Sequence, residues 1–310
     1  MNVFLWHVHG AWTTALVQGQ HRYLVPVIDD RGPDGLGRAR TYEWPPSAVE
    51  VTPERAAEEP VDVVILQRPH ELKLAERWLG RRPGRDVAAL YVEHNAPQGR
   101  INEMRHPLAD RDDLVIVHVT HFNDLFWDCG RTPTVVVEHG ILDPGARYTG
   151  ELPRAAAVIN EAPRRARVTG TDLLPRIAET VAVDLFGIDA GPLGGVEDLP
   201  HAELHEEMAR RRVYVHPIRW TSLGLSLLEA MHLGMPVAAV AATELPEAVP
   251  PEAGVVTTRL DELIRVTRRL IEDPEEARLR GKAAREAALA RYGLARFLRD
   301  WDELMQEVAA

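Results

Sequence analysis

The chain has 310 residues, of which 45% are hydrophobic and 27% charged. This composition is typical of a globular protein with a full hydrophobic core, and the length is sufficient for two domains of ordinary size. Its formal net charge of −11 argues against nucleic acid as a partner and against association with an anionic membrane. The single cysteine, Cys129, excludes an internal disulfide and a cysteine-based zinc cluster. No apolar run reaches membrane-spanning length and no charged leader precedes the first strand, so we expect a cytoplasmic protein.

The first thirty residues follow the pattern strand, glycine turn, helix, strand, which opens a doubly wound α/β domain. The strands are predicted at residues 3–8 and 23–28, and the helix at 13–19. His7 and His9 would share one strand face. Without a third ligand nearby, we interpret them as structural or substrate-facing residues rather than metal ligands. Residues 29–60, rich in Gly, Pro and charge, are predicted as a long loop with one short helix.

Four further strands are predicted in the first half, at residues 61–66, 87–92, 114–120 and 135–137. The strand at 87–92 delivers His94 to a loop at its carboxyl end, which is where ligands bind in open α/β sheets. His94 is therefore a candidate site residue, and the alternative is a loop histidine with a structural hydrogen bond. A hydrophilic segment after Glu138 is predicted to link the two domains.

The second half opens with a predicted strand at 154–160, followed by three closely spaced arginines, Arg164, Arg165 and Arg167, before a helix near residue 171. A guanidinium binds phosphate with forked geometry, so we expect a phosphate role for at least one of them; the alternative is a solvated arginine run. His201 and His205 lie four apart on a predicted helix, the spacing of metal ligands. Glutamates crowd the same turns, and this favours an exposed polar helix. Two or three helices are predicted to end the chain, at about 260–272, 274–292 and 294–308.

The most informative stretch is 213–241, in which a strand leads through Gly224 into an apolar helix that ends at Gly234. Thr221 and Ser222 can cap this helix, and Gly224 lets a ligand approach the backbone. A helix that opens just after a parallel strand directs its free N–H groups and positive dipole end toward a bound phosphate. One acid, Glu229, interrupts the apolar pattern, and its alternative interpretation is a surface glutamate.

Residues 224–231, Gly-Leu-Ser-Leu-Leu-Glu-Ala-Met, together with Gly-Met-Pro-Val at 234–237, resemble the donor-site signature of glycosyltransferase family 4, which are retaining group 1 glycosyltransferases. The resemblance implies that Glu229 holds the ribose of a nucleotide sugar and that His94 faces the donor sugar. It assigns donor binding to Gly10, Thr169, Thr221, Ser222, Gly224, Leu225, Ser226 and Glu229, and catalysis to His94, Arg164 and Arg167. The sequence departs from the family at Thr221, normally a glutamate, and at Thr169, normally a lysine.

The implied fold is GT-B, with two Rossmann-like α/β domains facing a central cleft: an acceptor-side domain at 1–145 and a nucleotide-sugar domain at 146–293. The helix at 294–310 would return to the first domain. The implied reaction is retaining transfer of a hexosyl or deoxyhexosyl group from a nucleoside diphosphate sugar to a hydroxyl of a small-molecule or glycan acceptor. No cofactor or metal is expected, because arginines and a helix N-terminus can neutralise the diphosphate. A nucleotide-sugar epimerase of the same fold and a catalytically silent nucleotide-sugar binding protein remain open.

Overall fold

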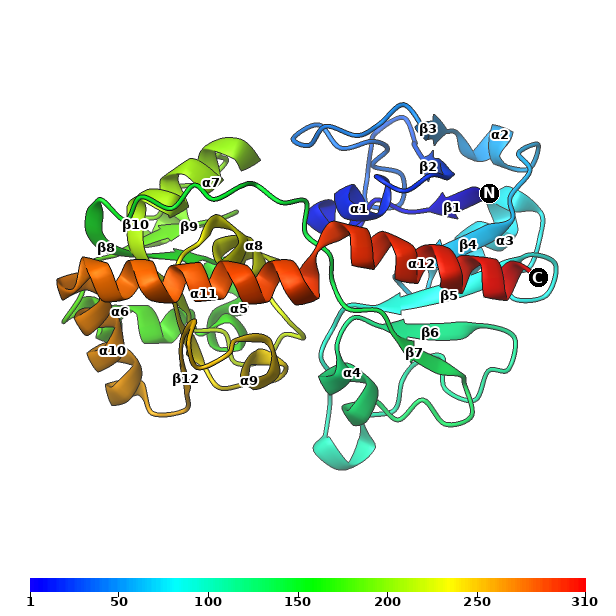
Figure 1. Ribbon diagram of the computed structural model, residues 1–310. Coiled ribbons are helices and arrows are strands. Elements are labelled where there is room, and N and C mark those ends of the chain that lie inside the picture. Colours follow the sequence, from blue (N-terminus) through cyan, green and yellow to red (C-terminus); the bar gives the residue numbers. More distant parts are fainter. The chain divides into compact units, whose positions relative to one another are not determined.

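The structure, a computed structural model, describes residues 1–310 and divides into two compact units (Figure 1). The first unit comprises Met1–Leu142 together with Leu294–Ala310, and the second comprises Asp143–Gly293. The sequence placed the change of domain at residues 145–146 and assigned the last helix to the first domain. No helix in the chain has both the length and the apolar character needed to span a membrane.

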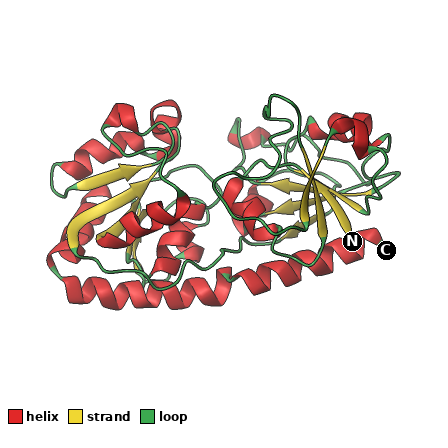
Figure 2. Ribbon diagram, turned by 90° about the horizontal axis from the view of Figure 1, so that it is seen from above, coloured by secondary structure: helices red, strands yellow, loops and turns green.

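The first unit is built on a seven-stranded parallel sheet in the order β3-β2-β1-β4-β5-β6-β7. Its strands are β1 (Asn2–Leu5), β2 (Arg22–Pro26), β3 (Ala48–Val51), β4 (Val63–Leu66), β5 (Ala88–Glu93), β6 (Val115–His118) and β7 (Thr134–Val136). Its helices are α1 (Gly10–Leu16), α2 (Pro53–Ala56), α3 (Glu71–Leu79), η1 (Ile101–Glu103), α4 (His121–Phe126) and α12 (Leu294–Ala309). Helices cover both faces of the sheet (Figure 2), as expected for a parallel sheet, whose two faces must both be buried.

Two details of the first unit differ from the sequence prediction. β3 lies within the stretch predicted as a loop, where the short segment Ala-Val-Glu-Val forms the edge strand beside β2. Prolines at 45 and 46 immediately before it concealed the strand pattern. β1 ends at Leu5, so His7 and His9 lie in the following loop and do not share a strand face.

The last helix, α12, packs on the first unit through its aromatic side chains. Phe297 and Trp301 are fully buried, and the Trp301 ring lies 5.6 Å from the ring of Trp12 in α1. The turn before the second unit lies against the same helix, since a Cβ added at Gly140 would come within 2.2 Å of the Phe297 Cβ atom. Burying each aromatic side chain contributes about 1.5–3 kcal/mol, which ties the end of the chain to this unit.

The second unit contains a five-stranded parallel sheet in the order β12-β11-β10-β8-β9. Its strands are β8 (Leu152–Val158), β9 (Val183–Phe186), β10 (Arg211–His216), β11 (Val237–Val240) and β12 (Gly254–Thr257). Its helices are α5 (Ala162–Thr169), η2 (Thr171–Leu173), α6 (Leu174–Ala178), η3 (Gly191–Leu193), α7 (His201–Arg210), α8 (Leu225–Leu233), α9 (Leu245–Ala248), α10 (Leu260–Glu272) and α11 (Pro274–Tyr292). The predicted α/β class is confirmed, because each unit has an all-parallel sheet covered by helices.

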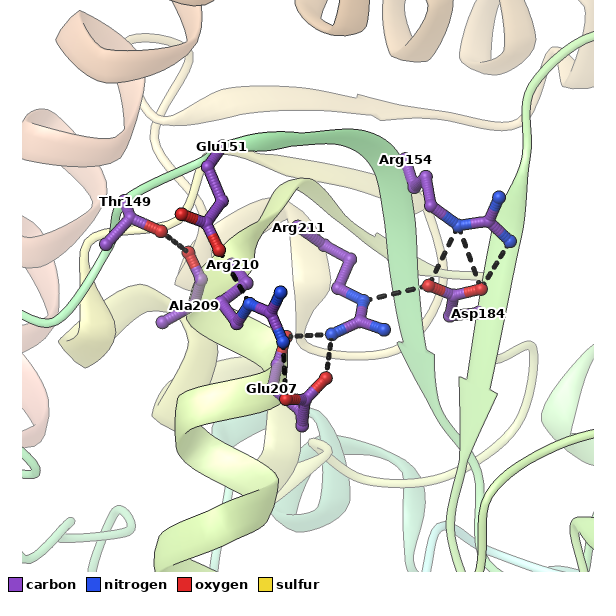
Figure 3. Close-up of polar contacts among 8 residues, drawn as sticks. All are labelled: Thr149, Glu151, Arg154, Asp184, Glu207, Ala209, Arg210 and Arg211. Carbon is purple, nitrogen blue, oxygen red and sulfur yellow. Dashed lines mark hydrogen bonds and ion pairs between the residues drawn. The ribbon is translucent and has the colours of Figure 1, made fainter.

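A network of ion pairs joins β8, β9 and β10 toward their amino ends (Figure 3). Asp184 accepts hydrogen bonds from the Nε atoms of Arg154 and Arg211, the latter at 2.8 Å. Glu207 in turn accepts from Arg210 and Arg211, and Arg210 also bonds Glu151 at 2.6 Å. Burial alone would raise the pKa of Asp184, but the two guanidinium groups outweigh it and lower that pKa. Each arginine of this network is matched by a carboxylate, so the network itself offers no unpaired cation to an anionic ligand.

Candidate functional site

The strand order of each sheet fixes where a ligand can bind. Successive strands are added on one side of β1 and then on the other in the first unit, so the order reverses between β1 and β4. In the second unit it reverses between β8 and β10. Open α/β sheets bind ligands just beyond the carboxyl ends of the strands at this point of reversal. The loops after β1, β4 and β5, and those after β8 and β10, are therefore the segments to inspect.

The helix after β10 starts later than the sequence suggested. Gly224 is the N-cap of α8 and no side chain caps the first turn, so the predicted capping by Thr221 or Ser222 is wrong. Ser222 is buried, and the Thr221 hydroxyl oxygen is buried without a hydrogen-bond partner. The first intrahelical bonds run from the N–H groups of residues 227 and 228 to the carbonyl of residue 224. The N–H groups of Leu225 and Ser226 come before these residues in the chain, so they form the free amino-terminal end of the helix.

Gly224 has a packing role that the sequence did not show. An ideal Cβ at this position would lie 2.6 Å from Cε1 of His216, the last residue of β10. Burial lowers the pKa of His216 to about 3, so its ring is neutral at pH 7. Beside it, the Tyr214 hydroxyl donates a hydrogen bond to the Ser226 Oγ atom at 2.9 Å. The first turn of α8 thus rests on a packed and uncharged layer that excludes any side chain at Gly224.

Glu229 is buried, with 6% of its surface exposed, so the interpretation as a surface glutamate is wrong. Its Oε1 atom lies 3.0 Å from Nε2 of His201, and its Oε2 atom lies 3.5 Å from Nε2 of His205. Burial by itself raises the pKa of this carboxyl, but the two neighbouring histidines outweigh it and lower the pKa to about 2. The carboxylate is therefore ionised and held in one orientation, five residues beyond Gly224 along α8.

The expectation that His201 and His205 lie on an exposed polar helix is wrong in its main point. His205 is 4% exposed, and the two imidazoles point from α7 toward Glu229 on α8. These three side chains are also the group in the structure with the geometry to hold a metal ion, since their ligand atoms all lie within 4.8 Å of one another. A signal was present in the sequence. His201, His205 and Met208 have the spacing i, i+4, i+7 of one helix face, and Met208 is buried.

The arginines after β8 lie on α5, earlier than the helix that the sequence predicted near residue 171. Arg164 is exposed and bonds Glu161, and Arg167 is exposed and lies 3.4 Å from Asp172. Arg165 differs from both: it is half-buried, forms no ion pair with an acid, and burial lowers the pKa of its guanidinium. Of the three, Arg165 is thus the one whose charge is not already matched by a carboxylate.

The end of α5 packs directly on the loop that leads into α8. A Cβ at Gly170 would lie 1.9 Å from the Pro217 carbonyl oxygen. The guanidinium of Arg219 in this loop bonds the Arg167 carbonyl at 2.9 Å. Thr169, the position of the family lysine, is buried and bonds the Thr171 hydroxyl at 2.9 Å. The two segments predicted to bind the diphosphate are therefore neighbours, although residue 169 itself points into the protein.

In the first unit, three loops converge on His94. Its Nε2 atom lies 3.0 Å from Oε1 of Gln67, which follows β4, and the Gln67 Nε2 atom donates to the Trp6 carbonyl at 2.7 Å. Because that carbonyl can only accept, the Gln67 oxygen is assigned to the His94 side, and His94 then carries its proton on Nε2. The His9 ring, which follows β1, lies 4.1 Å from the His94 ring. Burial, and then His9 and His139, keep the pKa of His94 well below its usual value.

The loop that carries His94 is anchored by a buried pair. Glu93 accepts a hydrogen bond from the backbone N–H of Asn95 at 2.7 Å, and its other oxygen lies 2.9 Å from Nε2 of His106. The turn after β5 is thus held by both side-chain and backbone contacts at the carboxyl ends of the strands, where a ligand is predicted to bind.

Gly10, assigned to the glycine loop, is the first residue of α1, where a Cβ would approach the Tyr42 ring to 3.0 Å.

A cavity of about 560 Å³ lies in the first unit, but at the amino ends of the strands, opposite the end where His94 lies. Its lining includes Val61, Ala88 and Val115, which stand at or just before the starts of β4, β5 and β6, together with Val308 of α12. Because ligands of open α/β sheets bind at the carboxyl ends of the strands, we do not assign this cavity to the active site.

Comparison with known proteins identifies what this arrangement resembles. Residues 196–287, which contain α7 and α8, match the model of the family described as Glycosyl transferases group 1. No curated protein matches the sequence. The predicted resemblance to group 1 glycosyltransferases is thereby confirmed for this part of the chain.

Solved structures resemble the whole chain. Sucrose-phosphate synthase from Thermosynechococcus elongatus matches with a TM-score of 0.73 and 15% identity over 99% of this chain and 98% of its own. HepE from Anabaena in complex with UDP and glucose matches with a TM-score of 0.74 and 16% identity over 99% and 100% of the two chains. HepE in complex with UDP-glucose gives a TM-score of 0.71 at 16% identity over the same shares. These likenesses confirm the GT-B fold class.

Proposed function

We propose that this protein is a retaining glycosyltransferase that moves a hexosyl or deoxyhexosyl group from a nucleoside diphosphate sugar to a hydroxyl of a small-molecule or glycan acceptor. One observation carries the proposal. The buried, ionised Glu229 lies one and a half turns behind the open N-terminus of α8, at the strand-order reversal of the second unit. This segment also falls within the match to the group 1 family.

In this proposal the second unit binds the donor nucleotide. The N–H groups of Leu225 and Ser226 and the positive dipole end of α8 face the diphosphate. Glu229 lies five residues beyond Gly224, roughly 7 Å along the helix axis, which is comparable to the distance from a diphosphate to the ribose hydroxyls. The carboxylate accepts hydrogen bonds from the two ribose hydroxyls, and such charged hydrogen bonds contribute ~1.5–3 kcal/mol each. Ser222 and Thr221 complete the surroundings of this site, whereas Thr169 is buried and supports the end of α5 from within.

Charge on the departing diphosphate is neutralised by the arginines of α5. Arg165 is the principal cation, because it alone of the three has no carboxylate partner. Arg164 and Arg167 contribute when they exchange their exposed partners for phosphate oxygens. Such electrostatic stabilisation, together with the positioning of the sugar, supplies the catalysis that this reaction needs from the protein. No metal or cofactor is required by this scheme.

His94 of the first unit is proposed to contact the donor sugar. Its proton on Nε2 is directed at Gln67, and the ring is neutral, so we propose that it packs against the donor sugar without carrying a charge. The low pKa of His94 keeps it neutral throughout the physiological range, so we assign it to positioning and not to acid catalysis. Gly10 and His9 shape the same edge of the sheet.

The test is an assay of product formation. The protein is incubated with UDP-glucose, because HepE, a protein of the same fold, has been solved with this compound, and then with other nucleoside diphosphate sugars and a panel of hydroxylated acceptors. A transferase releases the nucleoside diphosphate together with a glycosylated product, whose anomeric configuration by NMR tests retention. Glu229→Ala serves as the matched control. An epimerised sugar without a glycosylated acceptor indicates the epimerase, and donor binding without turnover indicates the silent binding protein.

A further inference from the structure

The cluster formed by His201, His205 and Glu229 has features that nucleotide binding does not explain. His201 and His205 are one turn apart on α7 and face the carboxylate of Glu229 on α8. The carboxylate oxygens lie 3.0 Å from Nε2 of His201 and 3.5 Å from Nε2 of His205. A ribose site requires the carboxylate, but it does not require two imidazoles whose Nε2 atoms converge on it.

The spacing of these atoms suits a small tetrahedral ion. Zinc binds histidine nitrogen and carboxylate oxygen at about 2.0–2.2 Å, which separates neighbouring tetrahedral ligands by roughly 3.3 Å. The two observed nitrogen–oxygen separations, each to a different oxygen of the Glu229 carboxylate, lie on either side of this value, and one ligand atom from each of the three residues falls within 4.8 Å of the others. Small side-chain rotations therefore suffice to bring all three atoms to an ion.

A second, independent observation points to a ligand. The Nε2 atom of His205 is buried in a residue only 4% exposed, and its contact with Oε2 of Glu229, at 3.5 Å, is too long for a well-formed hydrogen bond. An unsatisfied buried polar atom is destabilising, and bound metal would satisfy it. The buried carboxylate of Glu229 has ion pairs with these two histidines only, and with no arginine or lysine. A divalent cation would neutralise this charge.

We propose that His201 Nε2, His205 Nε2 and the Glu229 carboxylate bind one divalent transition-metal ion, with Zn²⁺ as the preferred ion. Two imidazoles and one carboxylate select zinc-like ions over Mg²⁺ or Ca²⁺, which prefer oxygen ligands. The side chain of His201 is 27% exposed, so an ion can enter from this side and keep a water molecule as its fourth ligand.

The site has a regulatory consequence that rests on the proposed function. If Glu229 also accepts hydrogen bonds from the donor ribose, the ion and the nucleotide compete for the same carboxylate. Zn²⁺ and UDP would then weaken each other's binding by the same factor, as linkage requires. Metal binding itself does not depend on the protein being a glycosyltransferase.

The experiment is a Zn²⁺ titration of the full-length protein, stripped of metal, in competition with a chromophoric chelator. Wild type should bind one equivalent, and Co²⁺ at the same site should give the intense visible absorption of tetrahedral coordination. His201→Gln, His205→Gln and Glu229→Gln should each weaken Zn²⁺ binding by more than the roughly 10- to 100-fold caused by loss of an outer-shell partner. His121→Gln, which removes an exposed histidine of the first unit, is the matched control and should bind as wild type does.

Far-UV circular dichroism establishes that each variant is folded. If the buried His205 variant does not fold, the partly exposed His201 and the near-isosteric Glu229→Gln variant decide the question. Failure of wild type to bind one equivalent, or equal Zn²⁺ affinity in wild type and these variants, overturns the proposal. Zn²⁺ binding that UDP leaves unchanged would support the metal site and contradict the ribose role of Glu229, so the two failures are distinguishable.

Discussion

Replacing Gly224 with alanine probes the packing beneath the first turn of α8. The added Cβ would lie 2.6 Å from Cε1 and 3.1 Å from Nε2 of His216, closer than ordinary van der Waals contact. The backbone at Gly224, with φ −74° and ψ 122°, is one that alanine adopts readily, so the penalty is steric. Overpacking costs about 1–3 kcal/mol, and the stiffer unfolded chain offsets ~0.4–1 kcal/mol of it. The expected net destabilisation is roughly 0–2.6 kcal/mol.

A double-mutant cycle isolates the contact. In a His216→Ala background the ring is gone, so Gly224→Ala should be neutral or stabilising by ~0.4–1 kcal/mol. The coupling energy between the two positions should therefore be about 1–3 kcal/mol, measured from urea unfolding followed by far-UV circular dichroism. The same penalty in both backgrounds would refute the claim that the His216 ring requires a glycine at 224. UDP affinity measured on the same variants separates this packing role from close approach of a ligand.

Three further predictions concern charge. Arg165→Ala should weaken UDP binding by ~1.5–3 kcal/mol in calorimetry, whereas Arg164→Ala and Arg167→Ala, which remove guanidinium groups already paired with acids, should have smaller effects; three equal losses would contradict the assignment. The pKa of His216 is about 3 in the folded protein, so only the unfolded state takes up a proton as the pH falls below about 6.5. Because of this residue, the free energy of unfolding should then fall by about 2 kcal/mol between pH 6.5 and pH 5. His216→Gln should remove that slope from the pH dependence of urea unfolding, and parallel curves for wild type and variant would show the prediction to be wrong. Asp184→Asn should destabilise the protein by about 1–2 kcal/mol, between the values for exposed and buried pairs. An unchanged unfolding midpoint would mean that the arginines of β8 and β10 find other partners.

The helices near the end of the chain were predictable because their signals are local. Helices α10 and α11 begin and end at the predicted residues, 260–272 and 274–292. Asp273 caps α11 by accepting hydrogen bonds from the N–H groups of residues 275 and 276, and Pro274 occupies the first helical position. Both residue types favour a helix start through contacts within four residues, so the sequence alone contains the information.

The surroundings of Glu229 were not predictable in the same way. The acid stood out because it interrupts an apolar helix, but its partner His201 lies 28 residues earlier on another helix. Local pattern suggested an exposed α7, since glutamates occupy its other faces, and only the packing of α7 on α8 turns the histidines inward. The requirement for glycine at position 224 likewise depends on a contact made only in the folded chain, since the turn between β10 and α8 brings the His216 ring against this position. The predicted roles of His94 and of the arginines stay predictions.

Calorimetry with UDP and its 2′,3′-dideoxy analogue, on wild type and Glu229→Ala in chelator-treated buffer, tests the central claim most directly. Glu229 accepting from two ribose hydroxyls should contribute about 2–4 kcal/mol, or ~30- to 1000-fold in affinity. Wild type should therefore bind UDP much more tightly than the analogue, Glu229→Gln should discriminate less, and Glu229→Ala should not discriminate. Equal discrimination by wild type and Glu229→Ala would contradict the assignment of the donor ribose to Glu229.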